Sequence, residues 1–184
     1  MFSQTVKRSA GFTIIEVLVS LVILSIGLLG IAGMQINSLK NNQSAYYRTQ
    51  AVHLAYELAD KMRANTAGVK NGSYDNANLL QNNNCENNTG CNSSAMAAND
   101  LYQWLSINAD HSIPNTLLQG TGVACIDSTP DDGCIVNQHC DGIGTIYAIK
   151  TFWLDRLDNV IAANADCSNF QQSNEVRFVM TFAP

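Results

Sequence analysis

A lone carboxylate, Glu16, stands at the beginning of a long stretch that otherwise carries no charge. Residues 17–39 contain only apolar, small or uncharged polar side chains. About 20 such residues in an α-helix, rising about 1.5 Å each, cross the hydrocarbon core of a membrane. A charge inside a membrane costs about 2.5–3.5 kcal/mol on insertion scales. We therefore expect Glu16 to need a cationic partner.

The partner that the sequence offers is an amine that forms only on cleavage. Gly11 stands at the boundary between a short polar leader and the apolar stretch, and Phe12 follows it. Cleavage after Gly11 would leave a free α-amino group on Phe12, about one helical turn from Glu16. This amine, in the same chain or in a neighbouring copy, would neutralise the carboxylate.

All six cysteines follow the apolar stretch. Lys7 and Arg8 precede it, so the positive-inside rule predicts a cytoplasmic N-terminus and a periplasmic remainder. An even number of cysteines in that oxidising compartment predicts disulfides. Six cysteines allow 15 pairings, and the preferred set has two local closures, Cys85–Cys91 and Cys125–Cys134. The third pair, Cys140–Cys167, would tie together the loops before the second and third predicted strands.

No group of residues in the sequence predicts catalysis, a cofactor or a metal. Cys134, His139 and Cys140 are zinc-ligand types, but a C-x-x-C pair is missing and the compartment favours oxidation. Residues 131–133 read as a turn rather than a calcium loop, because the carboxylates lack EF-hand spacing. The net charge is -5 and no basic cluster occurs, so direct nucleic acid binding is not expected.

One long helix must position Glu16. No proline interrupts residues 12–65, and apolar or small residues recur in steps of three and four beyond Leu39. This pattern predicts a helix from Phe12 to about Ala64. The stripe expected to pack on the rest of the protein comprises Tyr47, Ala51, Leu54, Leu58 and Met62. His53 lies on the polar face and is expected to be solvated.

The remainder of the chain predicts a small α+β unit. Residues 66–94 are rich in asparagine and read as a loop, and a second helix is expected at 94–107, capped by Ser93 or Ser94. Alternating apolar residues predict strands at 123–126, 145–154 and 175–182. The fold class is therefore α+β: a long N-terminal α-helix packed on a small antiparallel sheet, with a disulfide-clipped loop region.

The N-terminal region resembles the class III signal of type IV prepilins, over a match from Lys7 to about Met34. The most specific part of the match is G-F-T-I-I-E-V at residues 11–17. The resemblance implies that a prepilin peptidase cuts after Gly11 and N-methylates Phe12. It also implies that the mature subunit waits among inner-membrane lipids, as a single-pass protein with a periplasmic C-terminal domain, until it enters a filament at the cell surface.

The resemblance divides the chain into four expected parts. These are a leader peptide (1–11), a transmembrane and filament-core half of the helix (12–36), an amphipathic half (37–65) and a periplasmic or surface globular domain (66–184).

Residues 51–65, A-V-H-L-A-Y-E-L-A-D-K-M-R-A-N, resemble the PilV family of type IV pilus modification proteins. The runs at 25–33, 99–104 and 152–155 fit that pattern too. Many major pilins carry a proline in the glycine stretch, whereas this chain has none before Pro114. The resemblance implies a minor pilin that acts with other minor pilins, the major pilin and a tip adhesin in assembly, twitching motility, adhesion or DNA uptake.

Two other functions share some of these features. A minor pseudopilin of a type II secretion system has the same N-terminal features, namely a leader peptide and an apolar helix with one acidic residue. The asparagine-rich loop and the disulfides favour a pilus. A membrane-anchored periplasmic enzyme or binding protein would need a constellation of functional residues that the sequence lacks. An ordinary secretory signal is disfavoured, because the apolar core is long and Glu16 sits at its start.

Overall fold

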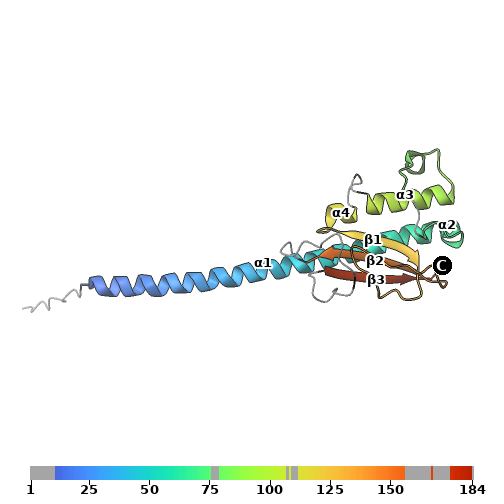
Figure 1. Cartoon of the computed structure of the whole chain (residues 1–184). Coiled ribbons are helices and arrows are strands. Elements are labelled where there is room, and N and C mark those ends of the chain that lie inside the picture. Colours follow the sequence, from blue (N-terminus) through green and yellow to red (C-terminus); the bar gives the residue numbers. More distant parts are fainter. Residues whose placement is uncertain are drawn as a thin grey trace, which may run out of the picture. The chain divides into compact units, whose positions relative to one another are not determined.

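The computed structural model describes residues 11–75, 79–106, 108, 112–155, 167 and 175–183 (Figure 1). The leader cations Lys7 and Arg8 lie outside the described residues. The chain forms two compact units, Met1–Gln43 and Ser44–Pro184. The first unit consists, in its described part, of a single helical segment; the second holds every other element.

The long helix α1 runs from Ile14 to Ala64, which confirms the predicted single helix and its C-terminal boundary. In the second unit α1 buries one stripe: Ala51, Leu54, Ala55, Leu58, Ala59 and Met62. This stripe contains four of the five predicted positions and adds Ala55 and Ala59. The fifth predicted position, Tyr47, is half-buried and packs against the same core. The small alanine side chains let other elements approach the helix closely, while His53 on the opposite face is exposed as expected.

In the residues that the structure describes, four short helical segments follow α1. Their bounds are α2 (Thr66–Lys70), the 3-10 helix η1 (Asn83–Glu86), α3 (Ser93–Leu105) and α4 (Ile113–Thr116). The prediction that 66–94 is entirely loop was wrong for α2 and η1, because asparagine side chains cap both: Asn65 accepts from Gly68 N, and Asn82 accepts from Asn84 N. The predicted helix at 94–107 is confirmed as α3, but Asn92 rather than a serine caps it.

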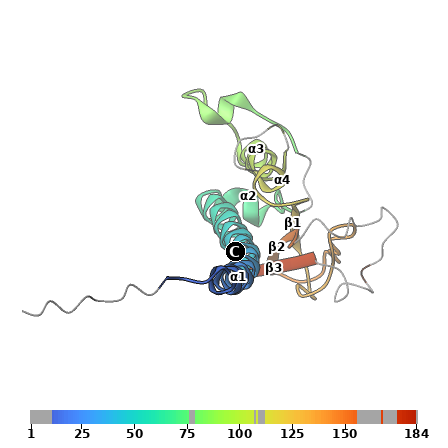
Figure 2. The same cartoon turned by 90° about the vertical axis from the view of Figure 1, so that its left-hand side faces the viewer.

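The three strands form one antiparallel sheet in the order β1-β2-β3, with bounds β1 (Thr121–Ile126), β2 (Tyr147–Leu154) and β3 (Glu175–Phe182). The bounds of β3 are as predicted, and the other two differ by two residues at their starts. Cys125 pairs with Ala148, and Tyr147 pairs with Phe182. Helices α3 and α4 lie on the β1 side of the sheet (Figure 2).

The central strand β2 is buried along its whole length, so both faces of the sheet are covered there. Side chains alternate between faces along a strand. Tyr147, Ile149 and Trp153 join the core that contains the α1 stripe. Ala148, Lys150 and Phe152 therefore occupy the other face, which the loop between β1 and β2 covers through contacts with Lys150.

Candidate functional site

The N-terminal half of α1 exposes a continuous apolar surface within its own unit. Phe12 and Ile14 are each 82% exposed, and Leu29 is 74% exposed. In the described part of the chain, α1 alone is long and apolar enough to cross a membrane. An apolar surface of this extent is not stable in water and indicates burial in lipid or against other chains.

Two serine hydroxyls in this apolar segment are satisfied within the helix. The hydroxyl of Ser20 donates to the Glu16 carbonyl, and that of Ser25 donates to the Leu21 carbonyl, each over 2.7 Å. These bonds to the preceding turn reduce the cost of a hydroxyl in an apolar environment. Glu16 is different, because its carboxylate has no such local donor among the described contacts.

Gly11 and Phe12 precede α1, and Glu16 lies in the first turn, where its N–H donates to Thr13 O over 3.1 Å. An acidic residue at this end of a helix is favoured by the helix dipole. In the uncleaved chain the nitrogen of Phe12 is an amide and cannot neutralise a carboxylate. The pairing of Phe12 with Glu16 therefore stays a prediction that requires the leader to be removed.

All six cysteines form disulfides: Cys85–Cys91, Cys125–Cys140 and Cys134–Cys167. The predicted pair Cys85–Cys91 is confirmed. The other two predicted pairs, Cys125–Cys134 and Cys140–Cys167, were wrong, because spacing is a weak guide. Doubling a loop adds only about 0.6 kcal/mol to its closure cost. A hydrogen bond to a charged group contributes about 1.5–3 kcal/mol, so a few polar contacts of the loop that carries these cysteines outweigh that difference in closure cost.

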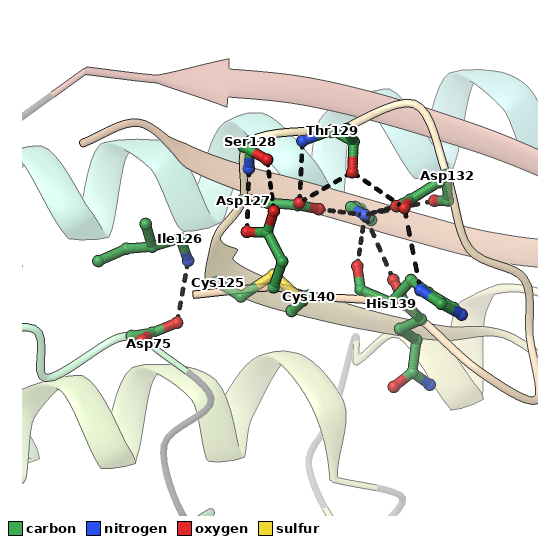
Figure 3. Close-up of a disulfide and its surroundings, with 12 residues drawn as sticks. Asp75, Cys125, Ile126, Asp127, Ser128, Thr129, Asp132, His139 and Cys140 are labelled. Carbon is green, nitrogen blue, oxygen red and sulfur yellow. Dashed lines mark hydrogen bonds and ion pairs between the residues drawn. A yellow bond between two sulfur atoms is a disulfide. The ribbon is translucent and has the colours of Figure 1, made fainter. Parts of the chain in front are cut away.

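Those polar contacts converge on Lys150, which is fully buried in the middle of β2. Its Nζ lies 2.5 Å from Asp127 Oδ2 and 2.7 Å from Asp132 Oδ1. It also donates to the backbone carbonyls of His139 (2.6 Å), Gln138 (3.3 Å) and Asp132 (3.3 Å). Figure 3 shows Asp127, Asp132 and His139 of this loop together with the Cys125–Cys140 disulfide. We call this group of contacts the Lys150 cage.

Two aspartates of this loop have lowered pKa values. Partial burial opposes the shift at Asp132, but hydrogen bonds from Lys150 and Thr129 outweigh it and lower the pKa of the carboxyl. At Asp141 the hydrogen bond from the Ser128 hydroxyl, helped by the Ile143 N–H, lowers the pKa. Both loop carboxylates are therefore held in their ionised form.

These contacts bear on the two metal alternatives. Cys134 and Cys140 are oxidised, so neither offers the thiolate that zinc binds. His139 Nδ1 lies 3.9 Å from Asp132 Oδ2, and the other oxygen of that carboxylate faces Lys150. The turn at 131–133 thus directs a carboxylate to a cation supplied by the chain itself.

A second polar network holds the Cys85–Cys91 loop against α3. Glu86 accepts from Gln103 over 2.7 Å and from Asn99 over 3.3 Å. Gln103 in turn accepts from Lys61 of α1 over 2.9 Å. The asparagine-rich loop is therefore anchored to two helices through Glu86, while its exposed residues remain accessible.

Tyr74, which follows α2, and Asp100 of α3 form a buried hydrogen-bonded pair. Tyr74 donates to Asp100 Oδ2 over 2.5 Å. Burial raises the pKa of Asp100, although the tyrosine hydrogen bond opposes the shift. Burial, followed by the hydrogen bond with Asp100, raises the pKa of the Tyr74 hydroxyl. Asn65 donates to the same hydroxyl over 3.2 Å, so the pair is tied to the end of α1.

Sequence reasoning missed Lys150 and the Tyr74–Asp100 pair. A lysine in an alternating strand is usually assigned to solvent, and its acidic partners come from a loop with no periodicity. The available signal was the position of Lys150 between Ala148 and Phe152, both apolar and on one face, with several aspartates in the preceding loop.

The fold is that of a pilin-like subunit: an exposed apolar helix with one acidic residue in its first turn, followed by an α+β unit with three disulfides. The helix is long and apolar enough to anchor such a subunit in a membrane. Residues 6–32 match the prokaryotic N-terminal methylation motif. Residues 33–102 match the family described as type IV pilin Tt1218, or Tt1218-like. The two matches adjoin, and together with the fold they show that the chain is similar to type IV pilins. No curated protein and no solved structure matches the chain.

Proposed function

We propose that the chain is a minor pilin, a structural subunit of low abundance that primes the assembly of type IV pili in a tip complex with other minor pilins. The observation that carries this proposal is the apolar N-terminal half of α1 with Glu16 in its first turn. An element of this kind suits a subunit that moves from lipid into a bundle of similar helices.

Processing precedes assembly in this proposal. Lys7 and Arg8 keep the leader in the cytoplasm, a prepilin peptidase cuts between Gly11 and Phe12, and the new amine of Phe12 is methylated. The rest of the chain lies in the periplasm, where the three disulfides suit an oxidising compartment.

Assembly then exchanges one apolar surrounding for another. The lipid-exposed side chains of α1 pack on neighbouring helices, so the transfer of apolar surface is close to neutral and packing and polar contacts decide the balance. Pairing of Glu16 with the Phe12 amine of an adjacent subunit adds a contact that depends on register. This contact favours one stagger between subunits.

The minor role rests on the likeness of residues 51–65 to PilV-type proteins and on the glycine stretch without proline. The expected partners are other minor pilins, the major pilin and a tip adhesin. Twitching motility, adhesion and DNA uptake are the activities that such a pilus would support.

Deletion of the gene, with complementation by the wild-type chain, tests the proposal. We expect fewer surface pili by electron microscopy, with the major pilin retained in the inner membrane on fractionation. Unchanged piliation would overturn the minor-pilin proposal. Loss of secreted folded exoproteins with normal pili would instead assign the chain to a type II secretion system.

A further inference from the structure

We propose that the Lys150 ammonium selects the cysteine pairing of the loop 127–142, so that Cys125 is oxidised with Cys140 and Cys134 with Cys167. Lys150 is then a positioning residue for disulfide formation. This inference concerns how the globular domain acquires its covalent structure, and it holds whether or not the chain acts as a minor pilin.

The first step is that the Lys150 cage places Cys140 beside Cys125. Lys150 and Cys125 lie on the same face of the sheet, because Cys125 pairs with Ala148 and side chains alternate along β2. The carbonyls of Gln138 and His139, immediately before Cys140, both accept hydrogen bonds from Lys150. The ammonium thus holds the chain that leads into Cys140 over the strand that carries Cys125.

The backbone at His139 supports this step. Its φ is 41°, in the left-handed region that residues other than glycine rarely adopt. The carbonyl of this same residue makes the shortest of the three backbone bonds to Lys150. An unfavourable conformation persists only where surrounding contacts hold it, and the bond to Lys150 is such a contact.

The second step is that the same loop directs Cys134 elsewhere. Cys134 and Asn137 exchange backbone hydrogen bonds of 2.8 and 3.1 Å in an isolated bridge. The preceding Gly133 has φ of 89°, and its carbonyl accepts from Arg177 of β3 over 2.9 Å. Cys167 reaches this turn, where its Sγ lies 3.3 Å from Asn137 O.

Before the Lys150 cage forms, Cys125 can also form a disulfide with Cys134. Cys125 and Cys134 are closer in sequence, so loop closure favours them, though weakly. Each disulfide forms when two thiols lose two protons and two electrons to an oxidised dithiol oxidoreductase, or to glutathione disulfide in vitro, which becomes reduced. Thiol–disulfide exchange then moves pairs until the most stable set remains.

The test is a disulfide map of the full-length protein, exported to the periplasm and purified in detergent, with Lys150→Met compared with wild type. No lysine, arginine or aspartate lies between Cys134 and Cys140, so fragmentation of the linked peptide within this stretch assigns each partner. We expect only Cys125–Cys140 and Cys134–Cys167 in wild type. In Lys150→Met we expect Cys125–Cys134 to appear and the native set to lose its dominance.

Lys70→Met, which removes an exposed lysine of α2, is the matched control and should keep the native map. If Lys150→Met is degraded, Asp132→Asn removes one carboxylate and leaves the lysine, and it should give a smaller shift in the same direction. A second measurement reoxidises reduced wild type and Lys150→Met with glutathione in urea and then removes the urea. Both should give the same mixture in urea, and only wild type should convert to the native set.

A native map in Lys150→Met, at wild-type rate and yield, would overturn the proposal. Conversion of the reoxidised Lys150→Met mixture to the native set after removal of urea would do the same.

Discussion

The indole Nε1 of Trp104 donates a hydrogen bond of 2.9 Å to the backbone carbonyl of Leu54. Both side chains are buried, and the bond ties α3 to the part of α1 that belongs to the second unit. The carbonyl of Leu54 lies within α1, so it has a helical donor in addition to the indole.

Replacement of Trp104 tests this connection. Trp104→Phe keeps much of the buried ring and removes the donor, so we expect the free energy of unfolding to fall by about 1 kcal/mol. Trp104→Ala also leaves a cavity and should cost about 3–5 kcal/mol. Urea unfolding of the full chain in detergent measures both, and Tyr102→Phe on the same helix is the control. If the free energy of unfolding fell by the same amount in Trp104→Phe and Trp104→Ala, packing of the buried aromatic ring would not contribute to stability as expected.

Glu16 gives the second prediction. Glu16→Val removes the charge from the apolar segment, so membrane insertion should be retained or improved. Incorporation into sheared filaments should fall strongly, because the partner of the Phe12 amine is lost, whereas Glu16→Asp should retain part of it. Immunoblots of membrane and filament fractions measure the two effects. Wild-type incorporation of Glu16→Val would argue against the pairing.

Gly11 gives the third prediction. Gly11→Ala should be processed partly or fully, because a methyl group is a small addition at the expected cleavage site. Gly11→Asp should accumulate as full-length precursor in the membrane. The mass of the membrane-bound protein distinguishes the two species. Normal shortening of Gly11→Asp would show that cleavage does not depend on this residue.

The loop carboxylates predict a pH dependence. The folded pKa of Asp132 is lowered from its ordinary value of 3.8, so the unfolded state binds protons more readily. Its contribution to stability is therefore complete above about pH 5 and is lost as the pH falls through the folded pKa. Buried Asp100 and half-buried Glu175 have raised pKa values and act in the opposite direction, since protonation relieves the cost of removing the charge from water.

A single variant separates these effects. Asp132→Asn should lower the Tm at pH 7 relative to wild type, and the difference should shrink as the pH falls below about 4. Asp131→Asn, at an exposed neighbour, is the control and should change the Tm little. A difference between wild type and Asp132→Asn that stays constant down to pH 2 would show that the carboxylate charge is not responsible.

Periodicity was enough to predict α1, α3 and the three strands, but not the short segments α2, η1 and α4. The stripe in α1 and the apolar face of β3 follow from side-chain geometry within each element. The α1 stripe is buried, and the predicted β3 face packs in or against the core through Val176, Phe178, Met180 and Phe182. The cysteine pairing could not be obtained in this way, because it depends on where Lys150 meets a loop without periodicity. The helix caps Asn65 and Asn92 could not be predicted either, because many asparagines in that region are equally good candidates.

The proposed role of α1 in assembly depends on an amine at Phe12 that faces a carboxylate at Glu16. Mass spectrometry of the N-terminal peptide of the protein from its native host measures this directly. The account predicts a mature chain that begins with N-methylated Phe12. A mature chain that retains Met1, or that begins beyond Glu16, would contradict it.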